Sequence, residues 1–181
     1  MAIAQPVRRY HPVIVVLHWL IAALIVLMLL GGYFVIAPMP EDAPQKLDVL
    51  EIHMALGMAI LGLMVIRLIL RAVTARPPAE ITGGPLDRVA VAVHGGFYLL
   101  VALMAVFGMW TAIGLHLNDI VFARNGAPLP PDLRHAPTVV AHGWAALVLA
   151  LLIVLHVAGA LYHRMVLRDE VMARMGFGAR R

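Results

Sequence analysis

Long stretches without charged side chains constrain this chain more than any other feature of its sequence. Residues 13–36 contain no Asp, Glu, Lys or Arg, and as a helix they would extend about 36 Å. That length crosses the roughly 30 Å hydrocarbon core of a bilayer with some tilt. A cleavable signal peptide is the competing interpretation, but the run is longer than a signal core, and the Pro-rich residues 37–40 make a poor cleavage site.

Three further apolar stretches, residues 49–70, 89–115 and 139–164, are also long enough to cross a membrane. Each contains only a few ionisable groups, and short segments rich in proline, glycine or charge separate them. Short connections favour antiparallel neighbours. We therefore predict an all-α integral membrane protein, a single domain over residues 1–181 that forms an up-down-up-down bundle of four transmembrane helices.

The composition excludes several classes of function. Hydrophobic residues make up 62% of the chain and charged residues 13%, unlike an ordinary soluble domain. Lys and Arg exceed Asp and Glu by only 14 to 10, which gives no indication of nucleic-acid binding. Because there is no cysteine, iron–sulfur clusters, thioether-linked haem, thiolate zinc sites and disulfides are excluded. The nine histidines are therefore the main candidate ligands.

The basic residues are distributed unevenly between the two ends of the predicted helices. Eleven fall on one side and three, Lys46, Arg124 and Arg134, on the other. The eleven are Arg8, Arg9, Arg67, Arg71, Arg76, Arg88, Arg164, Arg168, Arg174, Arg180 and Arg181. By the positive-inside rule, the side with eleven is cytoplasmic, so both termini are predicted to be cytoplasmic.

Five histidines lie inside the predicted spans, and counting from the span ends sorts them into two layers. His53 and His142 lie near the outer face, whereas His18, His94 and His156 lie near the cytoplasmic face. A histidine inside a bilayer needs a polar partner or a function. A lone membrane histidine is more often a hydrogen-bond partner between helices than a ligand, but five in two layers favour ligation. Which two of the three inner histidines form a pair stays open at this point.

Spacing along the fourth span supports this arrangement. His142 and His156 are 14 residues apart, so they return to within roughly 40° of each other about 21 Å along the helix. His163 follows seven residues later on the same stripe, and Arg67 lies 14 residues after His53 on the second span. One helix face therefore presents a histidine to each layer.

Two imidazole layers in an apolar bundle are typical of bis-histidine haem, and two layers indicate two haems. Arg67 and Arg71, near the cytoplasmic face, are candidates to pair with haem propionates or to bind a quinone. A transition-metal transporter is the alternative, but it would predict carboxylates or methionines beside the histidines in the membrane, and the spans offer no buried acid. The loop histidines, His11, His116 and His135, are expected to be solvated.

Several fragments, in this order and spacing, resemble the small bacterial cytochrome b561 proteins over almost the whole chain, and more distantly the haem-b subunits of membrane formate dehydrogenases and hydrogenases. The fragments are His18-Trp19, Ile52-His53 with Gly57, residues 65–71, His94 with Tyr98, and the histidines of the fourth span. The chain departs from the six-span animal and plant proteins of similar name, so ascorbate is not carried over as the electron donor.

The resemblance implies a specific set of ligands. His53 and His142 would bind the iron of the outer haem b, and His18 and His156 that of the inner one. His94 and His163 would then be free for a ubiquinone pocket beside the inner haem, with Arg71 as a contributor. Apart from these binding roles, no catalytic residue is expected.

The resemblance also implies an activity: electrons would pass from periplasmic superoxide, or another small donor, to ubiquinone in the bacterial inner membrane. One feature opposes superoxide, an anion, because the outer side carries six acids against three bases. The alternative is a quinone-linked haem-b membrane subunit of a larger oxidoreductase.

Overall fold

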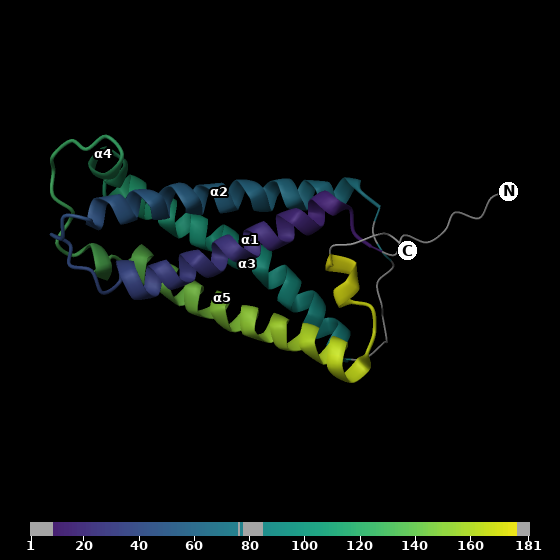
Figure 1. Cartoon of the computed structure of the whole chain (residues 1–181). Coiled ribbons are helices and arrows are strands. Elements are labelled where there is room, and N and C mark those ends of the chain that lie inside the picture. The colour runs from purple at the N-terminus through teal and green to yellow at the C-terminus, as the bar shows by residue number, and fades with distance from the viewer. Residues whose placement is uncertain (1–8, 76, 78–84, 177–181) are drawn as a thin grey trace.

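The computed structural model describes residues 9–75, 77 and 85–176, and within them every regular element is helical (Figure 1). The α-helices are α1 (Pro12–Gly31), α2 (Lys46–Val73), α3 (Pro85–Gly114), α4 (Leu117–Val121) and α5 (Pro137–Tyr162). Short π- or 3-10-helical turns extend or connect them, namely η1 (Gly32–Ile36), η2 (Leu133–His135), η3 (His163–Leu167) and η4 (Met172–Met175). The predicted all-α class is confirmed.

Four helices of the described chain are long and apolar enough to cross a membrane, as predicted. They cover Pro12–Ile36, Lys46–Val73, Asp87–Gly114 and Pro137–Leu167, with lengths of 25, 28, 28 and 31 residues. Successive long helices run in opposite directions, which gives the predicted up-down-up-down bundle (Figure 1).

The helices extend beyond most of the ends that the apolar pattern predicts. Pro12 and Pro137 occupy the first turns of α1 and α5, where the fixed φ of proline suits a helix and its missing N–H is not needed. The second helix begins at Lys46 and ends at Val73, three residues outside the predicted 49–70 at each end. Hydropathy marks the part of a helix that prefers lipid, whereas the backbone stays helical until a cap or a proline ends it.

Large apolar side chains cover the outside of the bundle. Val91, Ile113 and Val154 are 73%, 69% and 66% exposed. A soluble protein rarely leaves so many such side chains in water, whereas lipid tails accept them without cost. The surface therefore supports the interpretation that this bundle lies in a bilayer.

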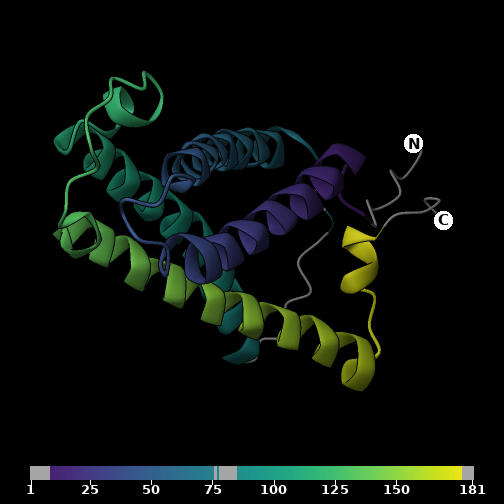
Figure 2. The same ribbon diagram turned by 60° about the vertical axis from the view of Figure 1, so that its left-hand side comes forward.

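We name the two ends of the bundle by the short helices that mark them. The α4 end carries α4, and the η4 end carries η4 (Figures 1 and 2). The sequence predicts that the α4 end faces outward and the η4 end faces the cytoplasm. A buried apolar cluster fills the middle of the bundle and consists of Leu17, Ile21, Ile25, Ile60, Met64, Val101 and Leu149.

The connection from α3 to α5 at the α4 end forms a small apolar core of its own. Its buried residues are Leu117, Ile120, Val121, Leu129 and Leu133, packed with Leu50 of α2 and Ala112 of α3. The sequence pattern suggested only a polar, proline-rich turn here. Leu117, Ile120 and Val121 stand at helical spacing, but a single turn is too short for the pattern alone to mark a helix. Leu129 and Leu133 lie among prolines and polar residues and follow no period, so their packing could not be predicted.

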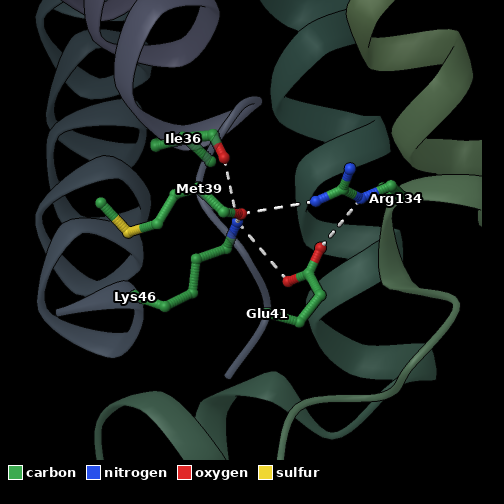
Figure 3. A network of polar contacts seen from close by, with 5 residues as sticks. All are labelled: Ile36, Met39, Glu41, Lys46 and Arg134. Carbon is green, nitrogen blue, oxygen red and sulfur yellow. Dashed lines mark hydrogen bonds and ion pairs between the residues drawn. The ribbon is translucent and has the colours of Figure 1, made fainter. Parts of the chain in front are cut away.

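A buried lysine fastens the α1–α2 connection at the same end (Figure 3). The Lys46 side chain is almost fully buried; its Nζ donates to the carbonyl oxygens of Ile36 and Met39, both at 2.9 Å, and lies 3.5 Å from Glu41. Arg134 of η2 reaches the other oxygen of Glu41 at 3.4 Å. Lys46 thus satisfies carbonyls left open where η1 ends, and Glu41 joins two connections.

At the η4 end the chain folds back after α5, so that η4 lies beside the first residues of α1 (Figures 1 and 2). Trp19 Nε1 donates to the carbonyl oxygen of Met175 at 2.9 Å, and the Tyr10 backbone N–H donates to that of Arg174 at 3.4 Å. The predicted orientation also used Arg8, Arg76, Arg180 and Arg181, which lie outside the described residues.

Candidate functional site

The two histidines nearest the α4 end face each other across the bundle. The rings of His53 on α2 and His142 on α5 have centroids 6.0 Å apart and planes inclined at 59°. The Nδ1–H of His142 donates to the carbonyl oxygen of Met104 at 3.0 Å, which leaves its Nε2 free to bind another group. His53 makes no hydrogen bond within the described chain, so both rings have a nitrogen available.

Glycines lie beside both rings of this pair. A Cβ added to Gly32 would lie 3.9 Å from His53 Cε1, and one added to Gly108 would lie 3.9 Å from His142 Cε1 and Nδ1. Gly57, which the sequence placed one turn from His53, instead faces Met28 on α1. A side chain at Gly32 or Gly108 would thus begin at van der Waals contact with an imidazole, and glycine keeps the backbone beside the two rings free of side chains.

Three histidines meet towards the η4 end, as the depth count predicted. His156 on α5 lies 6.2 Å from His18 on α1 and 5.2 Å from His94 on α3, between ring centroids. The ring of Phe97 lies 5.4 Å from that of His156. Close packing of α3 on α5 brings these rings together, since a Cβ added to Gly96 would lie only 2.9 Å from Leu152 Cδ1.

The three histidines of this layer differ in their hydrogen bonding. His94 Nδ1 lies 2.6 Å from the carbonyl oxygen of Ala90, one turn earlier on its own helix, so that nitrogen is occupied. His18 and His156 make no hydrogen bond within the described chain. Unpaired imidazole nitrogens inside a membrane are costly unless a ligand satisfies them, so His18 and His156 are the pair most in need of one.

A buried arginine with no acidic partner among the described residues, Arg67, lies at the same depth as these three histidines. Arg67 of α2 is 9% exposed, and its Nη1 donates to Tyr98 Oη at 2.8 Å. Its buried Nε has no partner, and no carboxylate of the described residues forms an ion pair with it. Arg71 follows one turn later in the last turn of α2. A buried guanidinium without a counter-ion is expensive, so an anionic or carbonyl group of a ligand would suit this position.

His163 lies in η3, seven residues beyond His156. Its ring contacts neither His18, His94 nor His156 in the described structure. Its Nδ1 lies instead 2.6 Å from Oδ2 of Asp169, and both side chains are partly exposed, His163 to 33% and Asp169 to 26%. Sequence reasoning did not identify Asp169, because it lies outside the helix and reaches His163 only through a backbone reversal.

The loop histidines take no part in either layer. His11 Nδ1 accepts the N–H of Val13 and caps α1, while His116 is 82% exposed near Asp119 and His135 is exposed in η2. Among the residues that the structure describes, no three His, Asp or Glu side chains gather as they would around a single metal ion.

Arg124 forms ion pairs with two acidic residues near the histidine pair of the α4 end. Its guanidinium lies 2.6 Å from Glu51 and 2.7 Å from Asp48, both on α2 and close to His53 in sequence. Hydrogen bonds to Glu51 and then to Asp48 raise the pKa of Arg124. The Arg124 guanidinium is therefore charged and already paired with these two acids.

The chain is similar to known proteins over nearly its whole length. A family model described as prokaryotic cytochrome b561 matches residues 9–178. A protein named cytochrome b562 from Cereibacter sphaeroides is 29% identical over 172 residues, which cover 89% of this chain and 90% of that protein.

Proposed function

This chain belongs to the prokaryotic cytochrome b561 family, a family of haem-b proteins of the membrane, and from this premise we propose that it carries electrons across the bilayer through two b haems. Electrons enter at the α4 end from a small donor, for which the resemblance suggests superoxide. They leave at the η4 end, where ubiquinone is reduced. The observation that carries this proposal is the presence of two facing histidine pairs, one towards each end of the bundle.

The spacing of each pair fits a shared iron. Two imidazoles that bind one iron through metal–nitrogen bonds of roughly 2 Å have ring centres roughly 6 Å apart. The His53–His142 and His18–His156 centroids are 6.0 and 6.2 Å apart. His94 lies only 5.2 Å from His156, which is close for two rings on one metal. We therefore assign His53 with His142, and His18 with His156, as the haem ligands.

A haem held by the two imidazoles would supply one-electron transfer. The protein supplies the ligands and their orientation. Met104 accepts the Nδ1–H of His142, which fixes the tautomer that presents Nε2. α5 contributes one ligand to each pair, 14 residues apart, or about 21 Å along the helix, so the two pairs divide the distance across the membrane.

The first prediction is stoichiometric: the purified protein should carry two non-covalent haem b groups per chain. Pyridine haemochrome absorbance divided by protein concentration measures this ratio. The exposed His135 supplies a control, because His135→Ala should keep both haems. A ratio of one or less in the fully reconstituted protein would contradict the two-layer assignment, and zinc or copper in place of haem would favour a transporter.

Arg67 is proposed to hold an inner haem propionate or the quinone. Its positive charge favours the electron-rich reduced haem, so Arg67→Met should lower the reduction potential of the η4-end haem and leave the other unchanged. A unit charge about 10 Å away at an effective dielectric constant near 20 contributes roughly 1.7 kcal/mol, or about 70 mV for one electron.

Redox titration followed at the haem absorbance bands measures this shift. Arg71→Met is the matched control, because Arg71 is more exposed and solvent screens its charge, so its effect should be smaller. Equal shifts of both haems, or no shift in Arg67→Met, would remove Arg67 from this role.

The charges at the α4 end bear on which donor the protein can use. Among the described residues, all three basic side chains counted at the α4 end are paired with acids, Lys46 and Arg134 with Glu41, and Arg124 with two acids of α2. Such pairing leaves little free positive charge to steer an anion. This favours, as second candidate, a haem-b subunit that receives electrons from a partner protein. Ubiquinone reduction by the isolated protein, driven by enzymatically generated superoxide, separates the two.

A further inference from the structure

The chain reverses direction directly after the last membrane helix and places a carboxylate on His163. Arg168 adopts a left-handed conformation, with φ of 54°, and the Asp169 backbone N–H then donates to the carbonyl oxygen of His163 at 3.3 Å. Asp169 Oδ2 accepts the Nδ1–H of His163 at 2.6 Å, and its Oδ1 accepts the Val171 N–H at 3.1 Å. Both carboxylate oxygens are thereby fixed.

The segment that follows Asp169 is also anchored at its C-terminal end. η4 is tied to α1 by the hydrogen bonds from Trp19 to Met175 and from Tyr10 to Arg174, and Figures 1 and 2 both show it beside the start of α1. Asp169 therefore lies between two anchored elements, η3 and η4.

The surrounding charges keep Asp169 ionised. Partial burial raises its pKa, but the hydrogen bonds from His163 and Val171, followed by the charges of His163 and Arg174, outweigh burial, so the pKa lies below its ordinary value of 3.8. The other ring facing His163 is that of Tyr162, at 6.4 Å between centroids. At neutral pH Asp169 can therefore accept the Nδ1–H, and Nε2 of His163 is the atom left for proton exchange.

We propose that Asp169 is a positioning residue for quinone protonation: it accepts the Nδ1–H of His163 and fixes the orientation of the ring, so that Nε2 passes a proton from water to a quinone oxygen. The proposal rests on the proposed function, in which ubiquinone is reduced at this end. Two electrons arrive one at a time from the donor, two protons follow, and both quinone C=O groups become C–OH. Each proton comes from water at the exposed edge of His163 and reaches the quinone oxygen through Nε2.

The test compares Asp169→Asn with the wild type, with Glu170→Gln as matched control, because Glu170 is the exposed neighbouring acid. We expect Asp169→Asn to keep both haem spectra and to slow haem reoxidation by a ubiquinone analogue by roughly 10- to 100-fold. Asp169→Glu should restore part of the rate, and Glu170→Gln should behave as wild type.

A second measurement does not depend on quinone. Nitrogen-15 NMR of the histidine rings should show His163 as the Nδ1–H tautomer in the wild type, and this preference should weaken in Asp169→Asn, because an amide oxygen is a weaker acceptor than a carboxylate. A wild-type rate in Asp169→Asn would overturn the inference, and so would a slower rate with an unchanged tautomer, since that would limit Asp169 to holding the C-terminal segment. Failure of the wild type to reduce ubiquinone would instead refute the proposed function.

Discussion

Alanine at His53 or at His142 is expected to reduce the haem content from two to one per chain, with loss of the α4-end haem. Alanine at His18 or at His156 should remove the η4-end haem. The reason is geometric: the ring centroids of each pair are 6.0 and 6.2 Å apart, which suits two imidazoles bound to one iron, and a single imidazole does not hold a low-spin b haem. Haemochrome quantitation gives the count, and a redox titration identifies the haem that remains.

His94→Ala is the matched control for the η4-end pair, because the ring of His94 on α3 also lies beside that of His156. One of its ring nitrogens is already bonded to Ala90, and its 5.2 Å separation from His156 is shorter than that of either assigned pair. We expect both haems to remain in this variant. Loss of a haem from His94→Ala together with retention in His18→Ala would reverse the assignment of the inner pair.

Much of the fold follows from the sequence because the bilayer imposes strong constraints. A segment that crosses hydrocarbon must satisfy its backbone internally, so uncharged runs of sufficient length can only be helices here. The ends were less predictable, because they depend on local capping. Lys46 shows why: hydropathy places a lysine outside a membrane helix, yet its Nζ is buried against the carbonyls of Ile36 and Met39, and α2 begins there.

The two histidine layers could be predicted because the depth of a residue in an antiparallel bundle follows from its distance in sequence from the end of its helix. The choice among His18, His94 and His156 could not be made by counting, since it depends on ring separations that only packing sets. Asp169 was missed for a different reason. Its contact with His163 depends on one left-handed residue, Arg168, and no sequence period marks a single reversal of the backbone.

His163→Gln is expected to slow haem reoxidation by a ubiquinone analogue by about 100-fold, while both haem spectra and haem reduction by the donor stay unchanged. His163 is not bonded to either proposed ligand pair, and its Nδ1 is held by Asp169, so the loss would fall on proton delivery alone, a contribution of roughly this size in general acid catalysis. Stopped-flow mixing of reduced protein with the quinone measures the rate.

His94→Gln should have a smaller effect than His163→Gln, since His94 already uses one nitrogen within its own helix. His135→Gln, at the α4 end, is the control for position. Because the two ends of the bundle are separated by the thickness of a membrane, a quinone cannot contact both groups at once. Unchanged reoxidation in the His94 and His163 variants, with a slower rate in His135→Gln, would therefore move the quinone to the α4 end and reverse the proposed direction of electron flow.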